Sequence, residues 1–424
     1  MAWTLAAALA WVATAGAQVV AITGGTVYPV SGPRIEHGTV VLRDGHIVAV
    51  GASVPIPAGA TTIDATGKWV TPGFINASSQ LGIEEVEAVP DTRDVQAKGH
   101  DAIAASFSAA DGLNPASQLI PPAREDGVTG IVLVPQGNLV AGLAAVVDLA
   151  AAPARDMVLK SAAAMVAQVG DARSAQLGAR GEIMATLRAL FGDVKRYAAH
   201  RAYYDLARSR PFSMTRANLE ALVPVLEGKI PLLIIANRAS DIANALTLAH
   251  DFGIRLIIGG GAEAWQVAGA LAAAHVPVLT GALVNIPASF AQLGQRQDNA
   301  ALLHSAGVPI VIIGNSDEED AVPFTTRNIR QDAGTAVAYG LPWAEALRAV
   351  TLAPAEAFGV ADRVGSLRPG REANIVVWSG DPFEFMTRAE HVFVRGREYH
   401  DVSRQDMLTN RYKTLPPAYG ASAP

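Results

Sequence analysis

The sequence predicts an α/β fold in which a barrel carries a small β domain built from both ends of the chain. Strand patterns occupy the first and the last parts of the chain, and apolar runs followed by amphipathic helices recur between them. The 424 residues, 50% of them hydrophobic, suffice to bury a large core. A barrel whose flanking β segments pair into one domain buries all of these segments.

The N-terminal β segment extends from residue 19 to residue 71. Residues 38–51 predict a hairpin, because Asp44 and Gly45 tolerate the positive φ angles of a tight turn. Residues 61–70 predict a further short pair of strands. At the other end of the chain we expect a strand at 374–378.

A second hairpin is expected near the C-terminus. Within residues 391–399, the strand segments 391–394 and 398–399 flank Arg395 and Gly396. The last stretch, residues 401–424, is polar and contains proline, which predicts an extended tail.

The middle of the chain has the pattern of βα units. Its apolar runs begin near Val128, Ile230, Ile254, Val276 and Val308. Spacings of about 20 to 35 residues fit parallel strands joined by helices. We expect a helix at 241–250 with Ser240 as N-cap and Gly253 as its stop, and another at 343–350 opened by Pro342.

The first residues resemble a secretion signal. An apolar run at 5–12 is followed by the small residues 15–17, and Gln18 would begin the mature chain. No Lys or Arg precedes the run, so a buried N-terminal helix or a misplaced start codon stays open. The signal predicts a periplasmic or secreted protein. No later stretch has about 20 uninterrupted apolar residues, so the sequence predicts no membrane span.

Composition excludes several classes of function. A formal net charge of -6 argues against nucleic acid as a partner, because such binding needs clustered Lys and Arg. The absence of cysteine rules out disulfides, thiolate catalysis and Cys-ligated metals.

Three segments carry a family resemblance. Residues 69–77 read Trp-Val-Thr-Pro-Gly-Phe-Ile-Asn-Ala, residues 351–355 read Thr-Leu-Ala-Pro-Ala, and residues 364–370 read Val-Gly-Ser-Leu-Arg-Pro-Gly. Together with the stretch up to Pro382, they resemble the amidohydrolase superfamily, and its imidazolonepropionase-like branch most of all.

The resemblance implies a domain layout. A (β/α)8 TIM-like barrel would occupy residues 74–362, with its site at the carboxyl ends of the strands. A small β-sandwich domain would combine 18–73 with 363–400, preceded by a signal peptide at 1–17 and followed by the tail at 401–424.

The resemblance also implies a metal site, which this sequence does not supply. The His-x-His of the first barrel strand falls on Ser78 and Gln80, and the later histidine positions fall on Ile235 and near Gly260. These residues are poor zinc ligands compared with imidazole. We therefore expect no tightly bound metal and no cofactor; a weakly bound divalent ion such as Zn²⁺ is the alternative that the family implies.

Two further positions concern the family's chemistry. Asp317 follows the last barrel strand, where the family's proton acceptor would stand; a cap for the next helix or loop is the alternative. Lys160 is a candidate for the lysine of the fourth strand. His250, His275 and His304 fall at helix ends or before strands, on the opposite face of the barrel.

The other residues expected to line the pocket each have two interpretations. Gly260, within the run 259–261, could serve an anion cradle or close packing. Arg238, beside Asn237, could bind a substrate carboxylate or pair with Asp241 or Glu263. Arg327 leaves the same choice. Gln80 could hydrogen-bond across the pocket or simply pack.

Two hypotheses about function remain. The first is an exported hydrolase of C–N bonds in non-peptide, cyclic or short-peptide amides that uses Asp317. The second is a catalytically inactive barrel that binds an amide-like small molecule or stabilises an active homologous amidohydrolase. A homo-oligomer is compatible with both.

Overall fold

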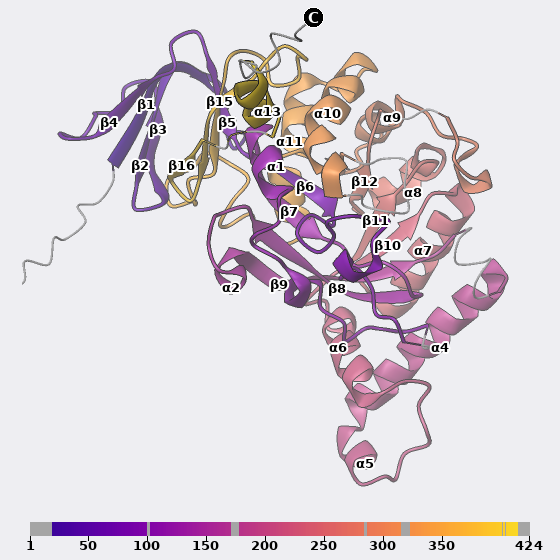
Figure 1. Cartoon of the computed structure of the whole chain (residues 1–424). Helices are drawn as coiled ribbons and strands as arrows, with labels where there is room; N and C mark the ends of the chain where they lie inside the picture. Colours follow the sequence, from indigo (N-terminus) through magenta and orange to yellow (C-terminus); the bar gives the residue numbers. More distant parts are fainter. Residues whose placement is uncertain are drawn as a thin grey trace, which may run out of the picture.

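The computed structural model describes residues 19–99, 102–170, 178–283, 286–314, 323–400, 402 and 404–413. The expected signal peptide and Asp317 lie outside these residues. The chain forms two eight-stranded sheets with helices around the second sheet (Figure 1).

The first sheet joins the two ends of the chain. Its strands are β1 (Val19–Val27), β2 (Ile35–Arg43), β3 (His46–Gly51), β4 (Thr61–Asp64), β5 (Trp69–Pro72), β14 (Ile375–Trp378), β15 (Ala389–Val394) and β16 (Arg397–Tyr399). The order is β16-β15-β14-β5-β1-β2-β3, with β4 also on β1. Antiparallel pairing of Ile375 with Pro72 connects the C-terminal strands to the N-terminal strands. A two-layer sandwich stays a prediction.

The turn chemistry read from the sequence is confirmed at both hairpins. Asp44 and Gly45 have φ angles of 49° and 81°, and Arg395 and Gly396 have φ angles of 49° and 72°. The expected pair within residues 61–70 is wrong, because β4 and β5 each pair with β1 in parallel and not with each other. The central strand β1 supplies the long-range partner that local sequence could not reveal.

The second sheet forms a nearly closed barrel. Its strands are β6 (Phe74–Ser79), β7 (Val128–Leu133), β8 (Val140–Asp148), β9 (Val158–Gln168), β10 (Leu232–Ala236), β11 (Leu256–Gly260), β12 (Val278–Thr280) and β13 (Ile310–Ile312). They pair in chain order from β6 to β13. The five predicted apolar runs supply β7 and β10 to β13.

One strand departs from the expected (β/α)8 pattern. β8 is antiparallel to both β7 and β9, whereas the other adjacent strands of the barrel run parallel. Only residues 134–139 join β7 to β8, and a parallel crossover needs about a dozen residues. The short connection therefore forces β8 to return antiparallel.

The described helices lie mostly on the outside of the barrel. They are α1 (Ile120–Glu125), α2 (Ala154–Met157), α4 (Arg180–Ala199), α5 (Arg201–Asp205), α6 (Arg216–Leu226), α7 (Ala239–Phe252), α8 (Ala268–Ala273), α9 (Asn299–Ser305), α10 (Ile329–Ala338), α11 (Trp343–Ala349), α12 (Leu352–Ala357) and α13 (Arg404–Tyr412). Short 3-10 helices are η1 (Pro90–Thr92), η2 (Ala109–Gly112), η3 (Ala264–Val267), η4 (Phe290–Gln292) and η5 (Pro323–Asn328). None of these described helices is long and apolar enough to cross a bilayer.

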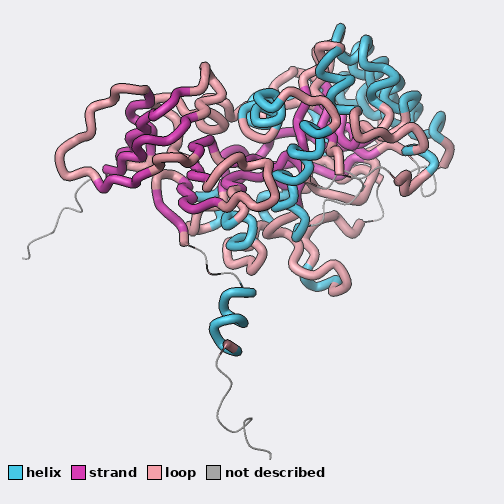
Figure 2. The backbone as a smooth tube through the Cα atoms, turned by 90° about the horizontal axis from the view of Figure 1, so that it is seen from above, coloured by secondary structure: helices cyan, strands magenta, loops and turns pink. Residues whose placement is uncertain are grey.

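Three details of the helices differ from expectation. The helix at 241–250 begins two residues earlier, so Arg238 and not Ser240 is its N-cap, while Gly253 ends it with φ 68° as predicted. Pro342 is an N-cap and not the first helical residue. The tail is not wholly extended, because residues 404–412 form α13, which stands apart from the body of the molecule in Figure 2.

The barrel interior is packed with hydrocarbon. Alternate strand residues such as Leu233, Ile257 and Val311 form one buried cluster together with α12. α12 follows the last barrel helices and closes the end where the parallel strands begin. We call this end the base, and the end where the parallel strands finish the mouth.

Candidate functional site

The mouth is where this barrel would hold a reacting group, because barrel sites form at the carboxyl ends of parallel strands. The loops after β6, β9, β10, β11 and β12 surround it, and the loop after β13 includes residues outside the described part of the chain. Of the residues predicted to line a pocket here, most come from the ends of β6, β10 and β11.

β6 brings Ser78 and Gln80 to this end. Ser78 is half-buried, and its backbone N–H donates to Asn76 Oδ1 at 3.1 Å. Gln80 is 1% exposed, and its Nε2 has no hydrogen-bond partner among the described residues. A buried donor without a partner is costly, so Gln80 stays a candidate pocket residue.

Hydrocarbon occupies the position where the fifth and sixth strands would present histidines. Ile235 pairs with Gly259 across β10 and β11. A Cβ atom added at Gly259 would lie 2.5 Å from Ile235 Cδ1. The Ile235 side chain therefore lies over the bare glycine, and neither of these two positions offers a donor to a metal ion.

Gly260 lies one residue beyond the sixth-strand position that stands beside Ile235. Gly260 pairs with Ala236, and the residue that pairs with Ile235 is Gly259. The φ of Gly260 is 79°, and an added Cβ would lie 2.4 Å from Asn237 Oδ1. The N–H of Gly261 donates to Ala236 O at 3.0 Å, which supports close packing rather than an anion cradle.

Glu263, in the loop after β11, forms hydrogen bonds with the segments that follow β10 and β12. Its Oε2 accepts from the N–H of Ala239 at 3.0 Å, and its Oε1 accepts from the N–H of Gly294 at 2.9 Å. The first bond satisfies a free donor at the start of α7, where a carboxylate is favoured. Asn237 supports this corner, because its backbone carbonyl accepts from the N–H of Glu263 at 2.9 Å.

The arginines behave differently from each other. Arg238 is exposed and makes no ion pair within the described residues; Asp241, one of its expected partners, is bound by Arg180 Nε at 3.0 Å. Arg327 Nη1 lies 3.7 Å from Asp126 Oδ2, so this side chain follows the salt-bridge interpretation. Sequence reasoning could not find Asp126, which is distant in the chain.

Lys160 is at the wrong end of the barrel for a metal ligand. It lies near the start of β9, and its Nζ donates to Phe358 O at 2.9 Å, just beyond α12. Burial lowers the pKa of Lys160 from its ordinary value. The family's lysine position belongs at the carboxyl end of a strand, so the assignment of Lys160 to it is wrong.

The base carries a cavity of its own, of about 900 Å³. It lies among the starts of β10 to β13 and the ends of the helices before them, and His250, His275 and His304 line it. These histidines are therefore far from the carboxyl ends of the strands. Within the described ranges, no three His, Asp or Glu side chains are grouped so that they could hold a metal ion.

The donor set at the mouth does not fit the family's metal. Zinc prefers imidazole, thiolate and carboxylate ligands, whereas the corresponding positions here hold a hydroxyl, a carboxamide, a hydrocarbon and a glycine. Asp317 lies outside the described residues, so its position relative to Gln80 or Glu263 stays a prediction.

Comparison with known proteins agrees with this architecture. Residues 236–399 match the family model described as "Amidohydrolase family". An imidazolonepropionase of Acidiphilium cryptum is 24% identical over 390 residues, covering 82% of this chain and 89% of that protein. Some other curated relatives match only short stretches, so the chain spans 8% and 13% of two of them.

Solved structures extend the match to almost the whole chain. An amidohydrolase from Thermotoga maritima has a TM-score of 0.81 and 28% identity, covering 90% of this chain and 100% of that one. An adenosine deaminase from Xanthomonas campestris with bound zinc has a TM-score of 0.52 and 16% identity, covering 93% of this chain and 97% of that one. The second likeness shows the fold alone.

Proposed function

We propose, from the premise that this chain belongs to the amidohydrolase superfamily, that it is a catalytically inactive barrel which binds a small amide-like molecule at its mouth. The family reaction is hydrolysis of C–N bonds. In that reaction a bound divalent ion supplies an activated water. The residues of this chain do not fit such an ion, so we derive no hydrolytic step through it.

The observation that carries the proposal is the contact between Ile235 and Gly259. A cation needs several converging donors, and here the Ile235 side chain fills the space above a glycine. Removing water from a cation without replacing its ligands is strongly unfavourable. A neutral ligand carries no such cost.

The polar groups of the mouth support a neutral ligand. The unpaired Nε2 of Gln80 can donate to a carbonyl oxygen, and Ser78 next to it offers a hydroxyl. Gln168, which ends β9 and is 7% exposed, adds a further carboxamide. Carboxamides and hydroxyls recognise amides by hydrogen bonds without charge.

Hydrolysis by a different arrangement is the second candidate. It is favoured by one observation, that an aspartate at position 317 follows the last barrel strand in the sequence, where the family places its proton acceptor. A weakly bound divalent ion would then be held by groups other than the usual histidines.

Metal analysis and turnover distinguish the two candidates. The full chain is purified without chelators, its zinc content is measured, and it is incubated with a panel of cyclic amides, acyl amides and dipeptides. We expect less than stoichiometric zinc and no turnover, with saturable binding of at least one neutral amide that weakens in Gln80→Leu.

The control is Asp320→Asn, which removes a nearby acid of the same run, beside Asp317→Asn. Stoichiometric zinc together with turnover that Asp317→Asn abolishes and Asp320→Asn retains would sink the proposal. If a homologous active amidohydrolase co-purifies and loses stability without this chain, the inactive barrel instead serves as its stabilising partner.

Export belongs to the same proposal. The apolar run at 5–12 and the small residues at 15–17 support it. Sequencing the N-terminus of the protein recovered from the periplasm should give Gln18 as the first residue. A cytoplasmic product that retains Met1 would contradict it.

A further inference from the structure

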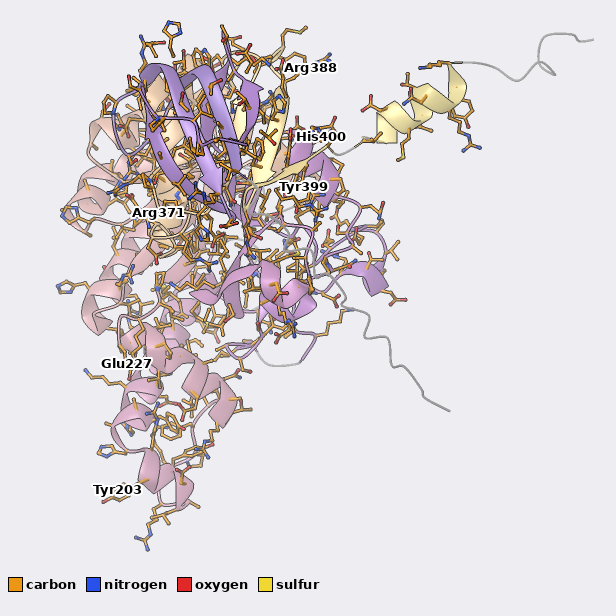
Figure 3. The ribbon with its side chains drawn as sticks, turned by 90° about the vertical axis from the view of Figure 1, so that its left-hand side faces the viewer. Tyr203, Glu227, Arg371, Arg388, Tyr399 and His400 are labelled. Atoms are coloured by element: carbon orange, nitrogen blue, oxygen red, sulfur yellow. The ribbon has the colours of Figure 1, made fainter. Side chains whose placement is uncertain are left out.

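The segment between β9 and β10 projects from the barrel. Residues 180–226, which we call the arm, comprise α4, α5 and α6, and α5 lies at its far end (Figure 1). Figure 3 places Tyr203 at the opposite end of the molecule from Arg388 and His400. The far end of the arm therefore projects, whereas α4 and α6 also pack on the barrel, where the ring centroid of Phe191 lies 5.6 Å from that of Phe252 at the end of α7.

The arm is attached at the mouth side. At its start, Arg180 Nε bonds Asp241 in the first turn of α7. At its end, Asn218 Oδ1 accepts from the N–H of Ser106, in the long loop that follows β6. Both contacts lie at the ends of elements that surround the mouth.

The arm is basic although the chain is acidic. It contains eight Lys and Arg residues against four Asp and Glu residues, in a chain of net charge -6. Arg201, Arg210 and Arg216 have carboxylate partners within the arm. Four other cations are exposed and make no ion pair within the described residues: Arg188, Lys195, Arg196 and Arg208.

The far end of the arm is also apolar. Tyr203 is 58% exposed and Leu206 is 62% exposed. Exposed aromatic and aliphatic side chains set among unpaired arginines are typical of the centre of a protein interface.

A surface of opposite character lies in the loop after β6. Residues 84–94, which we call the acidic rim, contain five Asp and Glu residues and one Arg. Arg93 pairs with Glu84, whereas Glu87, Asp91 and Asp94 are exposed and make no ion pair among the described residues. Val86 and Val89, between these acids, are 49% and 44% exposed.

We propose that the arm of one copy docks on the acidic rim of a second copy of this chain, and that the second arm docks on the first rim. Charge and apolar exposure are complementary between the two surfaces. One molecule carries both surfaces, so the two contacts are equivalent, as a two-fold interface requires. The occupant is thus a second copy of this chain, and the inference does not depend on whether the chain hydrolyses anything.

The oligomeric state tests this inference without any substrate. Sedimentation velocity of the full chain at micromolar concentration should show a dimer whose dissociation constant rises severalfold when NaCl increases from about 0.05 to 0.5 M. The double variant Lys195→Glu/Arg196→Glu should weaken the dimer at least about tenfold, and Glu87→Lys/Asp91→Lys should do the same.

A mixture of the two double variants is the decisive measurement. In the mixed dimer, the reversed arm meets the reversed rim at one contact, and the two unchanged surfaces meet at the other. Both contacts then join opposite charges, so a heterodimer should form at near wild-type affinity. The control Arg43→Glu/Arg368→Glu makes the same change of charge on exposed residues outside the arm and the rim, and it should leave the dimer unchanged. Circular dichroism verifies the fold of each variant.

Three outcomes would overturn the inference. They are a wild-type monomer throughout the concentration range, a dimer that neither double variant weakens, and a mixture that fails to form heterodimers. A monomer that instead binds anionic phospholipid vesicles through Lys195 and Arg196 would assign the arm to a membrane surface.

Discussion

At the base of the barrel, Trp378, Asp148 and Lys160 each have a partner on another element. At the mouth, by contrast, the Nε2 of Gln80 has no hydrogen-bond partner among the described residues, and Arg238 is exposed. Trp378 Nε1 donates to Thr71 Oγ1 at 2.8 Å, and Asp148 pairs with Arg395. The base thus ties the barrel to the first sheet. The two polar groups named at the mouth have no such tie to another element within the described residues.

The two ends of the barrel therefore differ in what a substitution is expected to change. The base buries large side chains such as Trp378, so changes there should be measured as a loss of free energy of unfolding. The mouth holds Ile235 over Gly259, a packing that occupies the place of a metal site.

The largest effect is expected for Trp378→Ala at the base. Trp378 is fully buried, stacks on Phe74 with ring centroids 5.1 Å apart, and lies against Gly127. Its removal should lower the free energy of unfolding by about 3–5 kcal/mol, measured by chemical denaturation. Phe385→Ala, at an 81% exposed residue, is the control and should change it by less than about 0.5 kcal/mol. Equal losses in both variants would contradict the comparison.

The ion pair of Asp148 with Arg395 should make the base sensitive to pH. Burial raises the pKa of Asp148 from 3.8 to about 6, in spite of Arg395. The folded state then binds more protons than the unfolded state, so stability falls as the pH rises through this window. Between pH 4 and 7 the wild type should lose about 2 kcal/mol relative to Asp148→Asn, which does not titrate.

Urea denaturation of both proteins at several pH values measures this difference. The substitution removes the charge and therefore changes stability at every pH, so the slope of the difference and not its size carries the test. A difference that is constant from pH 4 to 7 would show that Asp148 keeps an ordinary pKa.

At the mouth, the contact of Ile235 with Gly259 can be tested by a double-mutant cycle. Gly259→Ala places a Cβ against Ile235 Cδ1 and should cost about 1–2 kcal/mol. Ile235→Val removes that δ-methyl group, so Gly259→Ala should cost less than half as much in this background. Additive costs in the cycle would mean that Ile235 does not cover the glycine.

The smallest effect is expected for Lys160→Met at the base. The change removes the hydrogen bond from Nζ to Phe358 O but keeps the aliphatic part of the side chain. We expect a loss of about 1 kcal/mol by thermal or chemical denaturation, with ligand binding at the mouth unchanged. Lys195→Met, on the exposed face of α4, is the matched control. Loss of ligand binding in Lys160→Met alone would place Lys160 in the site after all.

Much of the architecture was predictable because it depends on local patterns. The turns at Asp44 and Arg395, the stop at Gly253 and five barrel strands follow from residue type and periodicity. The antiparallel β8 and the separate partners of β4 and β5 were not predicted. Their pairing depends on connection length and on strands distant in the sequence, which no local window contains.

The candidate site divides in the same way. The sequence by itself determined that imidazoles are absent from the positions of the family's ligands, because that depends only on residue identity at aligned positions. Only the tertiary structure decided that Ile235 covers Gly259, that Glu263 binds the start of α7, and that Lys160 lies at the base. Each of these depends on a distance between residues far apart in the chain, and such distances exist only once the barrel has closed.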